Sequence, residues 1–592
     1  MLQQRQNLIM MNFLKNLSSP RIRISVLLTV SILVMLICYR NLPILYIGLI
    51  ELLAFTGCVV FFKKVDITQY ELFLYKPHWF WRICEWYWTL WFCFNFIMPR
   101  LIRKYPSLLH FPYELNKVFR YFPDISGYEF YISLLIILPI IVLTMPLCIY
   151  LFRCIFKPVS ELFLNVTQFE KHFLVLSSSI LIVILLIICS KTSFFVYPTH
   201  TDNYISESSD KINMKYYDIN NFFETDTYSF FANPMYSYYD DTFRHPFFSC
   251  VFLLFMPLIQ LIAFAVNMVY ESQAYSFAIS VGIVQIFLYV SCVIPISRLY
   301  SYFTTRWFYQ LLSVMYVCSF PVIFSIVPER LIFTSILLLY SIYFILNNRI
   351  AYNSINTIFI SLGAIGATSL SIIPISFALL LRNKIKVILI LLCLSVVIII
   401  SRNMIFSHGI YGINHCFEQC NQFSITKSLV NNYTQLIYSC FMLPSYEIIE
   451  CFPYGIRNPN DNAFISMWIV QKSSVRDIAI GIVIVCLCLI SIVHSFRFSI
   501  VKVSGFWLFI SFALIGVIGF GNSQCVLYCS YFSWAIIPLT LLPFYWLWQK
   551  YPRLPIPQAL YLFAAYLAIS NLYFLYQVVQ IVSDRYIVPP GM

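Results

Sequence analysis

Long apolar runs recur along the whole chain, and they leave few folds open to it. Many of them have roughly the 20 residues that an α-helix needs to cross the hydrocarbon core of a bilayer. Of the 592 residues, 60% are hydrophobic and only 11% are charged, whereas a soluble domain carries about 25% charged residues. No water-soluble core can bury so much apolar surface, so we expect the bilayer to be the solvent for most of the chain.

The runs predict an all-α, polytopic membrane protein with about 13 transmembrane helices. Two runs carry signs of a break. Ile355–Leu381 contains two glycines and Pro374, and it is predicted to form two half-helices that turn near residues 366–368. Phe247–Val266 is predicted to be re-entrant or to lie at the outer interface. The other predicted spans are Ile24–Tyr39, Ile44–Phe62, Ile83–Met98, Tyr131–Phe152, Phe173–Cys189, Ala274–Ile296, Trp307–Val327, Leu331–Leu346, Val387–Ser401, Ile478–Val493, Val503–Phe520, Tyr531–Trp548 and Leu560–Val582.

The formal charge of +13 does not indicate a nucleic-acid partner, because most lysines and arginines lie in short links between apolar runs. This is the pattern of cytoplasmic loops that face anionic lipid. Basic residues before Ile24 and the absence of a small-residue cleavage site predict an uncleaved first helix with a cytoplasmic N-terminus. The predicted cytoplasmic anchors include Arg298, Arg306, Arg382, Lys384, Lys386, Arg497, Lys502, Lys550 and Arg553.

Two long polar segments, residues 192–246 and 402–477, are predicted to lie outside the cytoplasm. The first holds eight acids (Asp202, Glu207, Asp210, Asp218, Glu224, Asp226, Asp240 and Asp241) and three bases (Lys211, Lys215 and Arg244). In the second, Phe423–Leu443 is predicted to be an interfacial helix. A disulfide within its cysteine cluster stays open as an alternative, and the cluster comprises Cys416, Cys420, Cys440 and Cys451.

The window from Glu224 to Pro246 concentrates acids at the rim of the apolar body. Asp226 lies between two threonines, before an apolar segment. A carboxylate partly desolvated at the edge of a membrane cavity gains basicity, so Asp226 is the candidate catalytic base. Arg244 is a candidate phosphate ligand and His245 a candidate donor or acceptor contact, although both suit interfacial anchoring equally well.

Further acids in the predicted outer face are candidate substrate ligands. Asp240 and Asp241 precede an apolar run, where they would cap a helix or help to bind a divalent cation, Mg²⁺ or Mn²⁺, with Glu224 or Glu329. Glu329 and Arg330 form an acid–base pair between two apolar runs, and ionisable groups in such positions are candidates for function.

The early Asp226 and the later His245-Pro246 before an apolar run resemble the first outer loop of GT-C glycosyltransferases. This superfamily includes protein O-mannosyltransferases, the aminoarabinose transferase acting on lipid A and the oligosaccharyltransferase catalytic subunit. Phe247 stands where the family often has a second proline, and Glu329 resembles the family's second outer acidic motif. The resemblance, which is closer still to bacterial members of the superfamily, covers about residues 173–582. It makes 1–172 an N-terminal transmembrane extension and 173–592 the catalytic module.

The resemblance implies a glycosyltransferase of the bacterial inner membrane with an extracytoplasmic active site. Its donor would be a polyprenyl-phosphate-linked sugar, and its acceptor a glycan, lipid or protein of the cell envelope. Asp226 would deprotonate the acceptor hydroxyl, which attacks the anomeric carbon with inversion, while Arg244 or Arg330 stabilises the departing phosphate. Two alternatives stay open. One is a repeat-unit polymerase for O-antigen or capsule, and the other is a polytopic transporter or lipid flippase.

Overall fold

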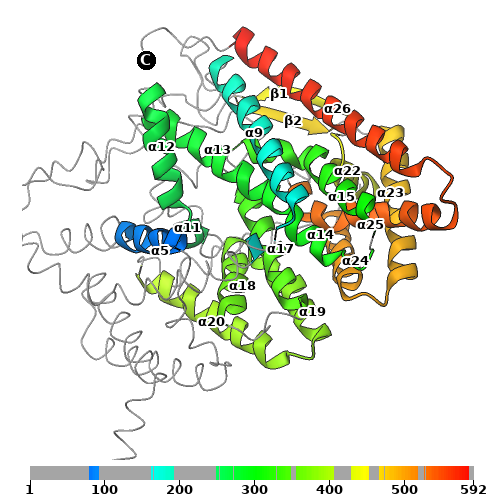
Figure 1. The fold of residues 1–592 in the computed structure, drawn as a ribbon, viewed down its shortest axis with the longest axis horizontal. Coiled ribbons are helices and arrows are strands. Elements are labelled where there is room, and N and C mark those ends of the chain that lie inside the picture. The colour runs from blue at the N-terminus through cyan, green and yellow to red at the C-terminus, as the bar shows by residue number, and fades with distance from the viewer. Residues whose placement is uncertain are drawn as a thin grey trace, which may run out of the picture. The chain divides into compact units, whose positions relative to one another are not determined.

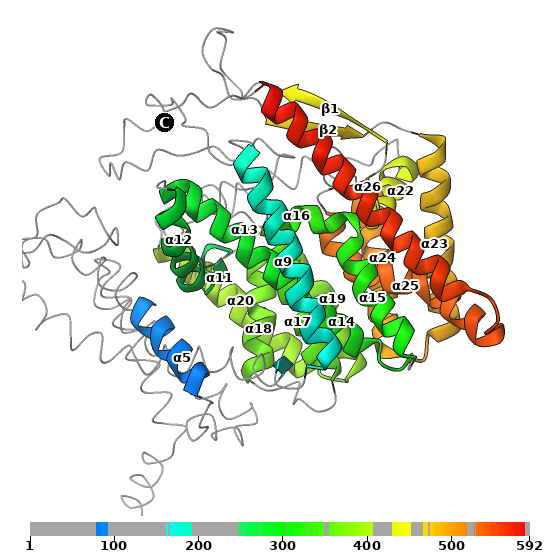
Figure 2. The ribbon, with the colours of Figure 1, turned by 45° about the horizontal axis from the view of Figure 1, so that its top comes forward.

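The computed structural model describes residues 79–92, 162–163, 166–191, 248–252, 254–270, 273–303, 305–327, 330–347, 355–405, 429–443, 445–451, 466–471, 474–517, 526 and 528–585. The chain divides into two compact units, one formed by residues 1–165 with 353–359 and the other by 166–352 with 360–592. In the first unit, α5 (Trp79–Phe92) is the long described helix. Most of the described elements belong to the second unit, which Figures 1 and 2 show from two directions.

The described part of the second unit is almost wholly helical. Its elements in the first half are α9 (Gln168–Lys191), α11 (Phe248–Phe252), α12 (Met256–Tyr270), α13 (Gln273–Ser291), α14 (Val293–Leu299), α15 (Arg306–Cys318), η3 (Phe320–Val322), α16 (Ile323–Ile326) and α17 (Arg330–Leu346). They continue with α18 (Ile355–Ala367), whose first residues belong to the other unit, η4 (Ser369–Ser371), α19 (Ile372–Leu381), α20 (Ile385–Ile405), α22 (Leu429–Ser439), β1 (Tyr446–Cys451), β2 (Ser466–Gln471), α23 (Val475–Ser495), α24 (Ser499–Ser511), η5 (Phe512–Val517), α25 (Cys529–Lys550) and α26 (Ile556–Arg585).

Six of the described helical stretches are long and apolar enough to cross a membrane, or seven if α15 and η3–α16, bent by 56°, form one broken span. The chain is therefore a helical membrane protein, as its sequence predicts. The predicted apolar runs are mainly helical in the residues that the structure describes, with local breaks, while Ile24–Tyr39, Ile44–Phe62 and Tyr131–Phe152 lie outside those residues. The predicted break in Ile355–Leu381 is confirmed at Thr368, between α18 and η4. Phe247–Val266 is broken too, by a turn at Leu254–Phe255 between α11 and α12.

The helices sort into central and peripheral ones by burial. In the most apolar 18-residue window of Ile279–Leu299, 83% of the residues are buried, and in that of α25 the share is 78%, whereas it is 28% in that of α23. α25 contains two internal prolines, and a neighbouring helix satisfies the carbonyl that one of them leaves without a donor. Pro543 has no N–H for the carbonyl of Leu539, and the Ser491 hydroxyl of α23 donates to that carbonyl instead.

Two expectations for the second polar segment are corrected. β1 and β2 pair as an antiparallel hairpin, where no strand was predicted, because their pairing joins residues up to 25 positions apart, such as Tyr446 and Gln471. The predicted interfacial helix is α22, and it is buried on all sides from Asn432 to Phe441. Its polar side chains bond within the helix, as Ser439 does to the carbonyl of Gln435, so their presence does not mark a solvated face.

Contacts between helix ends define two ends of this unit. At the first, the ring of Phe303 lies 5.2 Å from Phe498 and 5.7 Å from Tyr545, and Arg298 pairs with Glu170 at the start of α9. We call this the basic end, because the links that meet there carry the predicted cytoplasmic anchors Arg298, Arg306, Arg497, Lys502, Lys550 and Arg553. Near the opposite end, which we call the hairpin end, the Phe320 N–H donates to the carbonyl of Phe441, and α23 begins beside β1.

Candidate functional site

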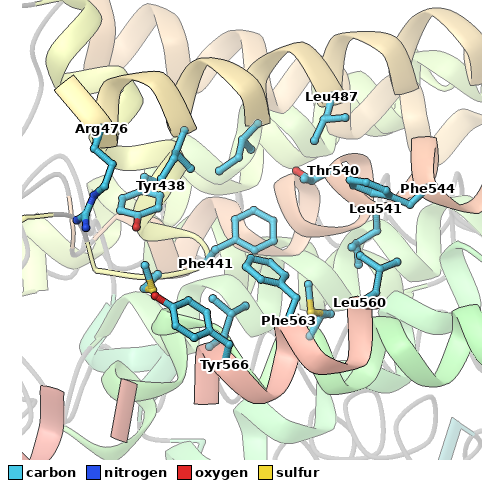
Figure 3. Close-up of a pocket in the computed structure, with 15 residues that line it drawn as sticks. Tyr438, Phe441, Arg476, Leu487, Thr540, Leu541, Phe544, Leu560, Phe563 and Tyr566 are labelled. Atoms are coloured by element: carbon cyan, nitrogen blue, oxygen red, sulfur yellow. The ribbon is translucent and has the colours of Figure 1, made fainter. Parts of the chain in front are cut away.

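An apolar groove of about 420 Å³ runs between four helices of the unit. α22, α23, α25 and α26 form its walls, and Met315 of α15 contributes to its lining. The α23 wall is a single stripe of side chains at helical spacing, from Arg476 to Leu487. The remaining apolar lining comprises Phe441, Met442, Ile480, Ile484, Leu541, Phe544, Leu560, Phe563 and Leu567 (Figure 3).

The polar groups of the lining gather mainly at one end of the groove. Arg476, Tyr438 and Tyr566 come from three different helices and lie together there, while Thr540 lies farther along, among the apolar side chains (Figure 3). This end lies at the start of α23, beside the β1–β2 hairpin. The groove therefore has the shape of a lipid site, with a long apolar part and a polar end.

The Arg476 guanidinium is held in place by two neighbours. Its Nε and Nη2 atoms each lie 3.1 Å from Oδ1 of Asp477, and Nη2 also donates to the Ser445 hydroxyl at 3.3 Å. Asp477 is 1% exposed, and its other oxygen accepts the Ser445 N–H. Its place in the first turn of α23 further stabilises the carboxylate, because the positive end of the helix dipole lies there.

Tyr438 brings a hydroxyl to the same end of the groove. Its side chain is 3% exposed, and the hydroxyl oxygen has no hydrogen-bond partner among the described residues. Burial raises the pKa of Tyr438 to about 12, so the phenol is protonated at every physiological pH. The hydroxyl is thus a buried donor that a ligand can use.

The groove is about as deep as one leaflet. Eleven residues of α23 separate Arg476 from Leu487, which at 1.5 Å per residue is about 16 Å. The hydrocarbon core of a bilayer is about 30 Å thick, so the length of the groove along α23 is about half of that thickness. A second apolar pocket of about 360 Å³, on the α24 side of α23, has no charged side chain in its lining.

Most of the residues predicted from sequence to form the site lie outside the described residues. This holds for Glu224, Asp226, Asp240, Asp241, Arg244, His245 and Glu329. Arg330 is the first residue of α17. Sequence reasoning missed Arg476 and Tyr438. Arg476 could have been found from the Arg-Asp pair at the start of an apolar run. Nothing in the sequence distinguishes Tyr438 from the other residues among the 43 tyrosines.

The helices that flank the predicted site residues end in the hairpin half of the unit. α9 starts at the basic end and its 24 residues rise about 36 Å, so Lys191 lies in the opposite half. The ring of Phe248 in α11 lies 6.4 Å from Phe333 near the start of α17. The Ser335 hydroxyl, also near that start, donates to the carbonyl of Ser530 at the start of α25.

Three further observations bear on the sequence-based hypotheses. No cluster of three or more potential metal ligands occurs in the part of the chain that the structure describes. Cys440 has a free, buried thiol, so it takes no part in the disulfide that was left open. No family model, curated protein or solved structure matches the chain.

Proposed function

We propose that this chain is a GT-C-like membrane glycosyltransferase that takes its sugar from a polyprenyl-phosphate donor. The observation that carries the proposal is the groove, because it offers a long apolar channel with an arginine and a tyrosine hydroxyl at its polar end. A lipid-linked donor has the same division into a long apolar tail and an anionic head. The flanks of the acidic segment lie in the same half of the unit as that polar end.

The proposed reaction moves one sugar with inversion. Asp226 takes the proton of the acceptor hydroxyl, whose oxygen bonds to the anomeric carbon as the bond from that carbon to the phosphate oxygen breaks. Arg244 or Arg330 stabilises the phosphate that leaves. Five further residues would contact the donor, the acceptor or a divalent cation, namely Glu224, Asp240, Asp241, His245 and Glu329. Residues 402–477 would cover the site.

The proposal includes the topology that the sequence predicts. The chain would have about 13 spans in a bacterial inner membrane, with the basic end in the cytoplasm and the hairpin end outside. A cell-envelope glycan, lipid or protein would be the acceptor. A flippase would need a polar path through both leaflets, whereas the polar groups of this groove gather mainly at one end, so the groove favours a transferase.

The proposal is tested by replacing the base. Asp226→Asn keeps the size of the side chain but removes its basicity, so we expect transfer of sugar from the polyprenyl-phosphate donor to fall by about 100-fold or more, a typical contribution of a general base. Transfer is measured in membranes that contain equal amounts of each protein, with Asp202→Asn in the same acidic segment as the matched control. Full transfer by Asp226→Asn would remove Asp226 from the mechanism.

A further inference from the structure

We propose that the polar end of the groove binds the phosphate of a single-chain lipid drawn from the leaflet at the hairpin end, with Arg476 and Tyr438 as its donors. This proposal extends the proposed function. It rests on that function only for what the protein does with the bound lipid. Binding itself requires no sugar transfer, so it can be tested separately. It also adds a phosphate ligand that differs from Arg244 and Arg330.

Arg476 is preorganised to bind an anion. Asp477 and Ser445 occupy Nε and Nη2, and they fix the plane of the guanidinium. Nη1 has no bonding partner among the described residues, and the side chain is 65% exposed at the mouth of the groove. A planar guanidinium with a free edge suits a phosphate, which accepts several N–H bonds. Asp477 is therefore a positioning residue.

Tyr438 provides independent support for a ligand at this place. Buried hydroxyls in native proteins nearly always have a hydrogen-bond partner, so an unpartnered one that lines a cavity points to a missing acceptor. A phosphate oxygen between Arg476 and Tyr438 would satisfy it. The Tyr566 hydroxyl, from α26, lies at the same end of the groove (Figure 3).

The size of the groove favours one hydrocarbon chain. A cavity of 150 Å³ binds one benzene ring, and on that scale the groove of about 420 Å³ holds on the order of 15 carbon atoms. A diacyl lipid has two chains, each about long enough to fill the groove alone. A single-chain lipid phosphate therefore fits better, and a polyprenyl chain would place only its first units here while the rest lies in the bilayer.

The lipid can reach the groove from the side. Phe563 and Tyr566 of α26 are 41% and 54% exposed, and α23 has an apolar outer surface formed by Ile482, Val483, Leu489 and Ile490. Lateral opening toward the bilayer means that the chain does not have to leave the hydrocarbon phase during binding. The polar end meanwhile stays at the membrane boundary, where a charged head group is hydrated.

The test measures binding without turnover. Purified full-length protein in detergent is titrated with hexadecyl phosphate, and the bound lipid is counted by native mass spectrometry. We expect one lipid per protein, and a Kd that rises about 10-fold or more in Arg476→Gln, because the variant loses a charge-assisted hydrogen bond. Tyr438→Phe, which removes only the hydroxyl, should raise the Kd by about 3-fold or more. Hexadecanol, which lacks the anion, should bind more weakly than hexadecyl phosphate to the wild-type protein.

Matched variants separate the site from general effects. Arg553→Gln at the basic end and Tyr573→Phe on an exposed part of α26 should leave the Kd unchanged. Ile484→Trp, which fills the apolar part, should abolish binding even though both donors remain. Equal binding of hexadecanol and hexadecyl phosphate, or an unchanged Kd in both Arg476→Gln and Tyr438→Phe, would overturn the proposal. Asp226→Asn should bind hexadecyl phosphate normally, so a failure of transfer and a failure of binding are distinguished.

Discussion

Glu170 joins the start of a transmembrane helix to the rest of the unit. Its Oε2 atom accepts the Thr167 N–H at 2.6 Å, while the Thr167 hydroxyl accepts the Glu170 N–H at 3.2 Å, the reciprocal arrangement of a capping box. The same Oε2 accepts a hydrogen bond from Arg298 at 3.2 Å. One carboxylate thus caps α9 and connects it to α14.

Glu170→Ala should therefore destabilise the protein. The variant loses the cap and leaves Arg298 without its carboxylate, and we expect a loss of about 2–3 kcal/mol, because Arg298 stays partly hydrated. The measurement is the thermal unfolding midpoint of the detergent-solubilised protein, followed by size-exclusion fluorescence. Lys171→Ala, at the exposed neighbouring position, is the control. A midpoint equal to that of the wild type would show that α9 does not depend on this carboxylate.

At the scale of single residues, some contacts can be predicted from the sequence and others cannot. The Thr167–Glu170 spacing is a capping signal that can be read directly. The link from Glu170 to Arg298 joins residues 128 positions apart, and no local pattern predicts it. The same limit applies to Arg476 and Tyr438, whose common role depends on how α22 packs against α23.

The α22–α23 pair depends on one glycine. A Cβ added at Gly481 would lie 2.6 Å from the Thr434 Cβ and 2.8 Å from the Thr434 carbonyl oxygen. Such distances are too short for any Cβ, and the neighbour includes backbone, which cannot rotate away. Only glycine lets the two helices approach so closely, and α22 carries Tyr438 at the polar end of the groove.

Gly481→Ala should push α22 away from α23. We expect a loss of about 1–3 kcal/mol, the usual range for overpacking a core, together with weaker binding of hexadecyl phosphate because Tyr438 shifts with α22. Gly363→Ala is the matched control. A Cβ there would meet only Leu337 at 3.9 Å, so this change should be neutral or slightly stabilising. Thermal midpoints of both variants test the expectation, and equal midpoints would contradict it.

At the scale of elements, the length of the apolar runs predicted most of the described helices, because a helix that crosses the bilayer needs about 20 apolar residues. The break at Thr368 was readable from its glycines and proline. The hairpin was not, since neither strand has strict alternation and each needs the other to form. The burial of α22 was hidden by its Asn, Gln and Thr side chains, which satisfy one another within the helix rather than facing water.

The whole unit has charged links on one side and the groove's polar end toward the other. Besides the links that define it, the basic end includes the α19–α20 link, where Arg382 donates to the carbonyl of Leu346 at the end of α17 and Lys384 follows. By the positive-inside rule we expect this end to face the cytoplasm. The acidic segment 192–246 and the polar end of the groove would then lie on the outer side.

Thiol labelling of intact cells tests this orientation. Ser301→Cys, in an exposed link at the basic end, should react with a membrane-impermeant maleimide only after lysis. Ser208→Cys, in the acidic segment, should react in intact cells. The wild-type protein, whose described free thiols are buried or lie in apolar helices, supplies the background. The reverse pattern would invert the topology and move the groove's polar end to the cytoplasmic leaflet.

The four-walled groove has a consequence for biosynthesis. Its walls are translated in the order α22, α23, α25 and α26, so three of them stand in the membrane before the fourth leaves the ribosome. We expect lipid chains to have access to the unfinished groove during that interval, so that the arrival of α26 would decide which chain is retained. Variants that delay the insertion of α26 should therefore trap the protein with bulk phospholipid in place of its ligand.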